Sequence, residues 1–200
     1  MRLGLIGAGR IGTNHAGILH AMPVVERLLI ADVAADRAED VARQLGRAEA
    51  VPLDAIFDGV DAVVIASSTD THEEFLVRAA SVGVTAFCEK PIALDLASTR
   101  RAVEAIDDAG ITVQMGFQRR YDPGMRAIHD KVHSGSLGTP YLVRSQTHDP
   151  APPPMDYIPV SGGIFRDCMI HDIDIVRFVT GQEVVSVTAT GAVLGFPVPG

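Results

Sequence analysis

Three side chains of this 200-residue sequence have the chemistry to move a proton and to stabilise negative charge at a reacting hydroxyl group. Lys90 stands in Glu89-Lys90-Pro91, directly after an apolar run, and its ammonium can stabilise an oxygen that becomes a carbonyl. Asp167 and His171 are four positions apart in a helical pattern, so an α-helix places both on one face. A carboxylate there can orient the imidazole, and histidine is well suited to act as a base near neutral pH. Lys90, Asp167 and His171 are therefore the candidate catalytic residues.

Each of these signals also has a simpler interpretation. Glu89-Lys90-Pro91 alone is equally consistent with a surface turn that carries an exposed charge pair. The spacing of Asp167 and His171 also suits an ion pair on a solvated helix face, or a metal site built from His171 and a neighbouring aspartate. No further ligand occurs at clear metal spacing, so we expect no metal ion. Cys88 and Cys168 are expected to be buried structural thiols rather than nucleophiles.

A glycine-rich loop near the N-terminus predicts a dinucleotide site. Gly7-Ala8-Gly9-Arg10-Ile11-Gly12 follows a strand-like run and opens a helical pattern, which is the context that G-x-G-x-x-G requires. The first glycine permits the tight turn, the second lets a pyrophosphate approach the backbone, and the third lets helix and strand pack closely. The helix N-terminus then offers unpaired N–H groups to the phosphates. The alternative is a glycine-rich packing turn without a ligand.

Asp32, at the end of the second apolar run, decides the expected cofactor. Its carboxylate would accept hydrogen bonds from the adenine ribose hydroxyls and repel a 2′-phosphate, which favours NAD over NADP. Arg10 and Arg37 complicate this, because either guanidinium could pair with a 2′-phosphate, but Asp32 occupies the position that the phosphate would need. The residues expected at the cofactor are Gly7, Ala8, Gly9, Arg10, Ile11, Gly12, Asp32, Arg37, Ser67, Ser68, Thr69, His72, Glu89 and Lys90.

Alternating strand and helix patterns across residues 1–117 predict a doubly wound parallel sheet of the Rossmann type. Apolar runs as continuous as these are typical of parallel strands that are buried on both faces. The expected strands are Leu3–Ile6, Arg27–Ala31, Ala62–Ala66, Thr85–Cys88 and Thr112–Met115. The expected helices are Ile11–Ala21, Asp36–Leu45, Asp70–Val82 and Leu96–Ala109, with Ser67-Ser68-Thr69 as possible caps of the third. Gly46, Gly83 and Gly110 follow three of the helices, where C-caps favour glycine.

Residues 118–200 predict part of a second, α+β domain. The patterns indicate helices over Pro123 to about Val132 and Ile164–Val179, and strands over Tyr141–Thr147 and Val184–Val193. Two strands alone are marginal in water, so this domain is expected to be incomplete and to expose a strand edge and apolar surface.

Composition excludes several classes of protein. The 17 basic and 25 acidic residues give a net charge of −8, which argues against a nucleic-acid or polybasic membrane surface. A hydrophobic content of 47% with 21% charged residues is typical of globular chains, and no apolar run is long enough to span a bilayer. The N-terminus lacks a signal-peptide pattern, so we expect a cytoplasmic protein with reduced thiols.

Four motifs together carry a family resemblance. The glycine loop, Glu89-Lys90-Pro91, Gly116–Asp122 and the Gly162-Gly163 approach to Asp167 and His171 resemble the glucose–fructose oxidoreductase/inositol dehydrogenase/MocA (Gfo/Idh/MocA) family. Two further segments, Asp149–Pro154 and Ser161–Asp167, resemble its inositol 2-dehydrogenase subgroup.

The resemblance implies NAD-dependent oxidation of a secondary hydroxyl of a cyclic polyol, myo-inositol or similar, to a ketone. It implies a Rossmann domain followed by an open-sheet domain that lines the substrate pocket and forms homo-oligomers, dimers or tetramers, when complete. This chain then stops within that second domain. The implied catalytic residues are Lys90, Asp167 and His171, the implied substrate-binding residues also include Arg119, His148 and Asp149, and a cis peptide is implied before Pro91. The alternatives are an NAD(P)-dependent sugar dehydrogenase or reductase of the same family, or a dinucleotide-binding fragment without turnover.

Overall fold

The computed structural model describes residues 1–148, 151–155 and 157–192. The chain divides into two compact units, which are described separately. Unit 1 comprises residues 1–118 and the described residues between 149 and 170, and unit 2 comprises residues 119–148 and 171–192. The second unit thus begins near the expected boundary after residue 117, but the segment that carries Asp167 belongs with unit 1.

Unit 1 contains a six-stranded parallel sheet in the order β3-β2-β1-β4-β5-β6. This is the strand order of a dinucleotide-binding Rossmann sheet, and it confirms the expected α/β class. The strands are β1 (Arg2–Ile6), β2 (Arg27–Ala31), β3 (Ala48–Ala50), β4 (Ala62–Ile65), β5 (Thr85–Cys88) and β6 (Val113–Met115). In the central strand β1, Leu5 pairs with Ile30 of β2 and Val64 of β4. All five expected strands are present within one residue of their expected ends.

Strand β3 was not expected from the sequence. It has only three residues, Ala-Glu-Ala, and both residue types are uncommon in strands. It forms because Leu28–Ile30 of β2 present a free edge with which Ala48–Ala50 can pair. Tertiary pairing, not local preference, therefore creates this strand.

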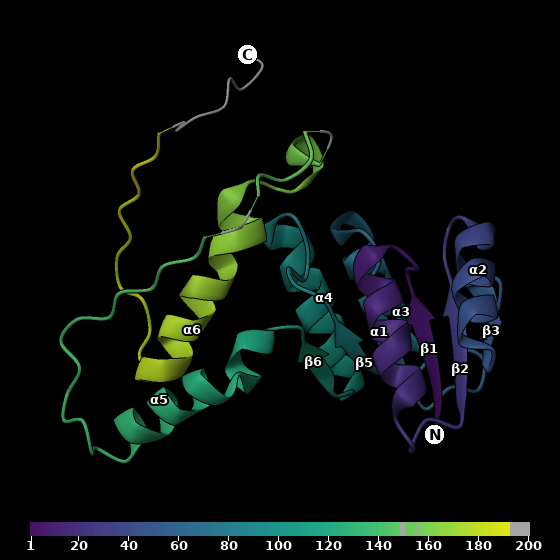
Figure 1. Cartoon of the computed structure of the whole chain (residues 1–200), viewed down its shortest axis with the longest axis horizontal. Coiled ribbons are helices and arrows are strands. Elements are labelled where there is room, and N and C mark those ends of the chain that lie inside the picture. Colours follow the sequence, from purple (N-terminus) through teal and green to yellow (C-terminus); the bar gives the residue numbers. More distant parts are fainter. Residues whose placement is uncertain (149–150, 156, 193–200) are drawn as a thin grey trace. The chain divides into compact units, whose positions relative to one another are not determined.

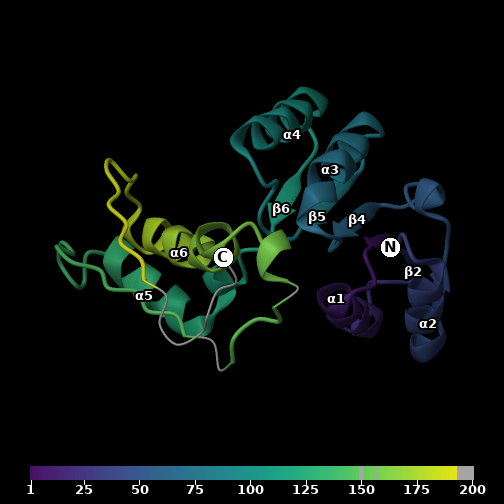
Figure 2. The ribbon, with the colours of Figure 1, turned by 90° about the horizontal axis from the view of Figure 1, so that it is seen from above.

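Helices cover both faces of the sheet, as Figures 1 and 2 show. The helices are α1 (Arg10–Ala21), α2 (Ala35–Leu45), α3 (His72–Ser81) and α4 (Leu96–Ala109). One buried cluster joins the sheet to α3 and α4 and includes Phe75, Leu76 and Ala102. The other joins the opposite face to α1 and α2 through Ala16 and Val41. Short 3₁₀ turns occur at Leu53–Ala55, Thr69–Thr71, Gln118–Tyr121 and Ile158–Val160.

Unit 2 is built around α5 (Pro123–His133) and the larger part of α6 (Ile170–Thr180). The carboxylate of Asp174, 6% exposed, accepts two hydrogen bonds from the Arg120 guanidinium, with Nε 2.8 Å away. The Phe178 ring stacks on His129 of α5 with centroids 4.2 Å apart, so an aromatic contact joins the two helices, while the ion pair joins α6 to the 3₁₀ turn that contains Arg120.

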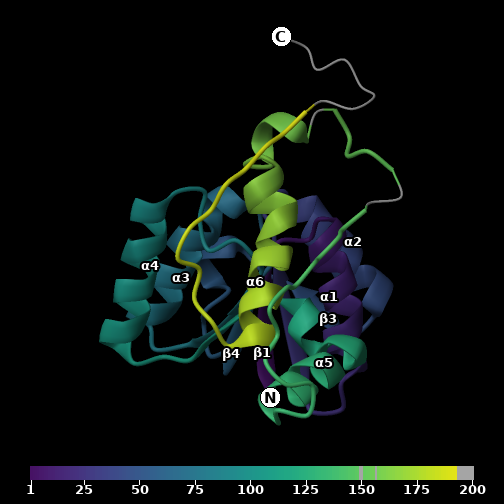
Figure 3. The same ribbon diagram turned by 90° about the vertical axis from the view of Figure 1, so that its left-hand side faces the viewer.

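The two strands expected in residues 118–200 are not present among the described residues. Tyr141–Thr147 and residues 184–192 run as irregular chain, which Figure 3 shows for the latter as a yellow trace without an arrow. A strand needs a hydrogen-bonded neighbour, and neither segment pairs with one in the described part of unit 2. The expected exposed apolar surface is found, however, since Tyr141 is 96% and Val185 98% exposed.

The helix expected over Ile164–Val179 differs at its start. Phe165–Met169 forms a π-helical turn, and the α-helix begins only at Ile170. The apolar spacing in the sequence does not distinguish a single π turn from an α turn, and such turns are frequent at functional sites. Gly162 and Gly163, with φ of 80° and 83°, lead into this turn.

Candidate active site

The glycine loop lies at the carboxyl edge of the sheet, where β1 ends. Gly7 has a φ of +98°, and its N–H donates to the Ala31 carbonyl at 2.8 Å. A Cβ at Gly12 would lie 1.8 Å from the carbonyl oxygen of Gly7, so the turn and α1 can pack only with glycine there. A Cβ at Gly9, in contrast, would meet nothing within 4 Å. The fold therefore requires Gly7 and Gly12, while Gly9 leaves open space in front of the N-terminus of α1, as a bound pyrophosphate requires.

Asp32 lies beside this loop at the end of β2. Its Oδ2 accepts a hydrogen bond from the Ala8 N–H at 2.7 Å, and its Oδ1 accepts one from the Ala34 N–H at 2.9 Å. The Asp32 side chain is only 7% exposed, and the largely exposed Arg37 guanidinium approaches its Oδ1 to 3.8 Å. The carboxylate thus holds the glycine loop against β2, and its expected role in excluding a 2′-phosphate stays a prediction.

The Ser67-Ser68-Thr69 segment follows β4 at the same edge, but it does not cap α3 through a side chain. A 3₁₀ turn intervenes, in which the Thr71 N–H donates to the Ser68 carbonyl at 3.0 Å. The Ser67 hydroxyl lies 2.7 Å from the Thr71 hydroxyl, so it serves the turn. A cofactor contact of this segment stays a prediction.

His72 is 1% exposed and connects two loops of the edge. Its Nδ1 lies 2.7 Å from the Pro91 carbonyl oxygen, and its Nε2 lies 3.2 Å from the Ser67 carbonyl oxygen. Both contacts are to backbone atoms of the protein itself. This favours a role in positioning the loops over the direct cofactor contact expected from the sequence.

Lys90, after β5, is held by Asp167 from the π-helical turn within the same unit. The Lys90 Nζ donates to the Asp167 backbone carbonyl at 2.5 Å and to its Oδ1 at 3.1 Å. The two side chains are 16% and 24% exposed, so the ion pair is largely shielded from solvent. Asp167 occupies two of the three N–H donors of the ammonium, which leaves one that can reach a substrate oxygen. The Lys90–Pro91 peptide is cis, as the family resemblance implied.

Tyr157 is a neighbour of Asp167 that sequence reasoning missed. Burial and the Asp167 carboxylate raise the pKa of Tyr157, so its hydroxyl keeps its proton and can donate to that carboxylate. No motif marks this tyrosine, which follows three consecutive prolines, Pro152-Pro153-Pro154. The Asp167 carboxylate therefore lies near Tyr157 as well as Lys90.

His171 lies in the first turn of α6, is half-buried, and belongs to unit 2. Because Asp167 sits in a π turn, the α-helical argument that put both side chains on one face does not apply to it directly. The pairing of Asp167 with His171 stays a prediction.

The substrate-binding residues expected from the family have varied surroundings. The Arg119 guanidinium donates to Oδ1 of Asp172 at 3.1 Å and to the Thr147 hydroxyl at 3.0 Å. His148 is exposed, and Asp149 lies outside the described residues. Arg119 thus has a structural partner, and the substrate roles of all three residues stay predictions.

Glu89 contacts a residue that the sequence did not single out. His15 of α1 donates through Nε2 to Oε1 of Glu89 at 2.7 Å, and the two side chains are 21% and 22% exposed. No motif in the sequence marks His15 as a site residue. Its position three residues after Gly12 was the available signal.

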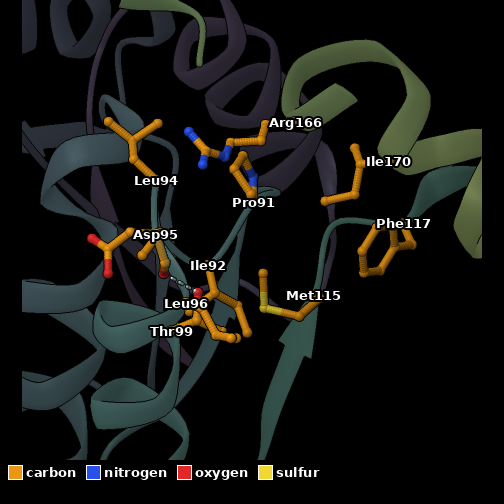
Figure 4. Close-up of a pocket in the computed structure, with 11 residues that line it drawn as sticks. Pro91, Ile92, Leu94, Asp95, Leu96, Thr99, Met115, Phe117, Arg166 and Ile170 are labelled. Atoms are coloured by element: carbon orange, nitrogen blue, oxygen red, sulfur yellow. Dashed lines mark hydrogen bonds between the residues drawn. The ribbon is translucent and has the colours of Figure 1, made fainter. Parts of the chain in front are cut away.

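A cavity of about 380 Å³ lies beside Pro91 in unit 1, as Figure 4 shows. Its lining is mostly apolar and includes Ile92, Leu94 and Met115, with Arg166 at its border. It contains none of the candidate catalytic side chains, and a polyol would need more hydrogen-bonding partners than it offers. We therefore do not assign the substrate to this cavity.

Two further expectations concern metals and thiols. Across the described ranges, no cluster of three or more His, Cys, Asp or Glu side chains could hold a metal ion. Cys88 is fully buried, and burial raises the pKa of its thiol far above the ordinary range, which suits a structural residue and not a nucleophile. In the part of the chain that the structure describes, no helix is long and apolar enough to cross a membrane.

Comparison with protein families decides the assignment. Residues 1–117 match the profile described as "Oxidoreductase family, NAD-binding Rossmann fold", and residues 125–197 match the Gfo/Idh/MocA C-terminal domain. The chain belongs to the Gfo/Idh/MocA oxidoreductase family. Unit 1 therefore carries the NAD-binding Rossmann fold of this family, in agreement with the glycine loop and Asp32.

Known members of the Gfo/Idh/MocA family resemble the chain over almost its whole length. The myo-inositol 2-dehydrogenase of Thermotoga maritima is 43% identical over 97% of this chain and 59% of its own. A crystal structure from Sinorhizobium meliloti 1021, provisionally named a myo-inositol dehydrogenase, has a TM-score of 0.91 at 43% identity, over 97% of this chain and 59% of its own. The scyllo-inositol dehydrogenase of Lactobacillus casei, solved with NAD(H) and scyllo-inositol, has a TM-score of 0.80 at 29% identity, over 92% and 57%. The chain thus spans less than two thirds of the length of these relatives.

Proposed function

We propose that the protein is an NAD-dependent dehydrogenase that oxidises a secondary hydroxyl of a cyclic polyol, of the myo-inositol type, to a ketone. The observation that carries this proposal is the Lys90–Asp167 ion pair at the carboxyl edge of the NAD-binding sheet. An ammonium that is fixed by a carboxylate and keeps one donor is suited to hold a substrate hydroxyl. The inositol dehydrogenases among the relatives support the substrate class.

The reaction removes two hydrogens from one carbon–oxygen unit. NAD supplies the acceptor for the hydride that leaves the carbon. His171 accepts the hydroxyl proton, and the pair of electrons from the O–H bond forms the carbonyl. Lys90 stabilises the oxygen as its negative charge develops, and Asp167 holds Lys90 in place.

A panel of substrates tests this proposal with the full-length protein. We expect NADH to form with one or more inositols, and the Lys90→Ala and His171→Ala variants to lose about 10²- to 10⁴-fold in kcat with little change in NAD affinity. Lys90→Arg is the matched variant, because it keeps the charge but not the compact ammonium. Turnover with aldoses alone would redirect the proposal to the sugar dehydrogenases of the family. NAD binding without turnover on any polyol or sugar would contradict it.

Cofactor preference is a second test. Asp32 should make NAD preferred over NADP. A 2′-phosphate beside this nearly buried carboxylate would form a like-charge contact, which typically costs several kcal/mol of binding free energy. Asp32→Ala should narrow the ratio of kcat/KM values for the two cofactors. It should also lower stability, since the Ala8 and Ala34 N–H groups lose their acceptor. Glu39→Ala, which removes an exposed carboxylate of α2, is the control and should change neither. Equal efficiency with both cofactors in the unmodified protein would contradict the assigned role of Asp32.

A further inference from the structure

We propose that His15 is a positioning residue for Lys90, and that it acts through Glu89. This rests on the proposed role of Lys90 in the reaction. His15 lies on α1, the helix that opens from the glycine loop, and Glu89 immediately precedes Lys90 after β5. The His15–Glu89 contact therefore ties the helix that faces the cofactor phosphates to the segment that carries the catalytic lysine.

The geometry of this contact is that of a short charge-assisted hydrogen bond. Nε2 of His15 lies 2.7 Å from Oε1 of Glu89, and both side chains are about four-fifths buried, with exposures of 21% and 22%. Burial alone would raise the pKa of Glu89, but the hydrogen bond and charge of His15 and the Lys90 backbone N–H lower it overall. Glu89 is therefore an ionised acceptor for His15, and it directly precedes Lys90 in the chain.

Two neighbours restrict the pair to this arrangement. The His15 ring packs edge-on against Phe87 of β5, with centroids 5.4 Å apart. A Cβ at Gly116 would lie 2.7 Å from Oε2 of Glu89, so the absence of a side chain at the end of β6 gives the carboxylate its space. Gly116 does not have a positive φ, so its role is steric and not conformational.

At the C-terminal end of the Glu89-Lys90-Pro91 segment, Nδ1 of His72 contacts the Pro91 carbonyl. Lys90 thus stands between two residues that are each held by a histidine from a different helix. Removing His15 should leave Pro91 fixed and the Glu89 N–H bonded to the Ile65 carbonyl at 2.9 Å, but it should release the Glu89 carboxylate beside Lys90. A displacement of a catalytic group by about 1 Å can cost up to about 10²-fold in rate. We call the restraint of Lys90 by the His15–Glu89 contact its bracing role, and we expect it to affect turnover more than NAD binding.

The test compares His15→Ala, His15→Gln and Gly116→Ala in the full-length protein. His15→Ala should lower kcat by about ten- to a hundredfold while the Kd for NAD changes by less than about threefold. His15→Gln retains an N–H donor and should recover part of kcat. Gly116→Ala leaves residue 15 unsubstituted but should displace the Glu89 carboxylate, so it should also lower kcat. His20→Ala, on the same helix, is the control and should leave kcat unchanged.

Amide hydrogen exchange of residues 88–90 provides a readout that does not depend on turnover. His15→Ala should accelerate exchange at Lys90, while Glu89 stays protected by its bond to the Ile65 carbonyl, and His20→Ala should accelerate neither. If the unmodified protein oxidises no polyol or sugar but the exchange responds as expected, the proposed function fails and the bracing role stands. If the unmodified protein turns over and His15→Ala changes neither kcat nor exchange, the bracing role is overturned. A loss of NAD affinity equal to the loss of kcat would also overturn it, since His15 would then act on the cofactor.

Discussion

In unit 1 the helices rest on a parallel sheet whose strands are almost wholly apolar, whereas α6 in unit 2 contacts the 3₁₀ turn at Arg120 through an ion pair and α5 through an aromatic stack. Leu5, Ile30 and Ile65 of the sheet are at most 1% exposed, and two buried clusters lie on its faces. Unit 2 buries Asp174 against Arg120 together with Ile175 and Val179 of α6, and it leaves Tyr141 and Val185 exposed. Apolar burial contributes in proportion to area and needs no partner charge, while an ion pair is costly to bury and depends on pH.

This difference indicates which contacts hold each unit in its folded structure. Unit 1 holds the cofactor loop and Lys90 on a rigid frame, because every strand but those at the two edges of the sheet has neighbours on both sides. Unit 2 holds its helices by a few specific contacts, and its apolar segments lack strand partners within the described residues. We therefore expect substitutions in the buried core of unit 1 to lower global stability, and those at the ionic contacts of unit 2 to change local order.

The largest contrast is expected between Leu5→Ala and Val185→Ala. Leu5 is fully buried in the central strand, so its truncation should cost about 2–5 kcal/mol of unfolding free energy. Val185 is 98% exposed, so its truncation should stay within about 0.5 kcal/mol. Urea unfolding followed by circular dichroism measures both. Equal effects would contradict the division into an apolar-core unit and a loosely covered one.

A second pair separates folding from cofactor binding inside unit 1. Gly12→Ala places a Cβ 1.8 Å from a backbone oxygen, so it should destabilise the protein by about 3 kcal/mol or more. Gly9→Ala meets open space in the protein, so its melting temperature should stay near that of the unmodified chain. It should nevertheless weaken NAD binding, because the methyl group occupies the approach of the pyrophosphate. Calorimetric melting and titration with NAD distinguish the two; full NAD affinity in Gly9→Ala would contradict the assigned path of the cofactor.

A third prediction concerns the ion pair of unit 2. Asp174→Asn keeps the shape but removes the charge that receives the Arg120 guanidinium. Since Arg120 is 38% exposed and can reach water, we expect a loss of about 1–3 kcal/mol and not the full cost of an isolated buried charge. Faster amide exchange confined to α5 and α6 is the measurement. Glu183→Gln, which breaks the exposed Arg177–Glu183 pair of the same unit, is the control and should change nothing measurable. Faster exchange in the sheet of unit 1 as well would show that the two units share their stability.

The same contrast explains how much could be read from the sequence. The five strands of continuous apolar residues and the helices between them were predicted within one or two residues, because burial on both faces leaves a clear local pattern. Strand β3 was missed because only the free edge of β2 creates it. The strands expected near Tyr141 and Val185 did not form, because alternation predicts a strand but cannot supply its partner.

The candidate site residues show the same contrast between features that a local sequence pattern predicts and features that depend on contacts between distant segments. The glycine loop, Asp32 and Lys90 stand directly after strands, so the parallel sheet brings them to one edge. His15 and Tyr157 were missed because their contacts, to Glu89 and Asp167, join segments that are distant in sequence. The π turn at Asp167 could not be predicted either, since its backbone pattern leaves no mark on the residue spacing.

The smallest expected effect is a local acid transition of unit 2 that unit 1 should not share. Burial would raise the pKa of Asp172, but hydrogen bonds from Ser145 and Thr147 and the charge of Arg119 lower it overall. A carboxyl with a depressed pKa contributes stability above its unfolded value of about 4 and loses it as the pH falls through the folded value. Acidification below about pH 4 should therefore release Ser145 and Thr147 from α6.

Carboxyl NMR titration of Asp172, with amide exchange near residues 145–147, measures this transition. Thr147→Val removes hydrogen bonds of 2.9 Å to both carboxylate oxygens, so the depression should shrink and the transition should move to higher pH. Asp172→Asn has no charge to lose, so its segment should already be released at neutral pH and show no acid step. An unchanged acid step in Asp172→Asn would assign the transition to another carboxylate, and unit 2 would then be held by contacts other than this cluster.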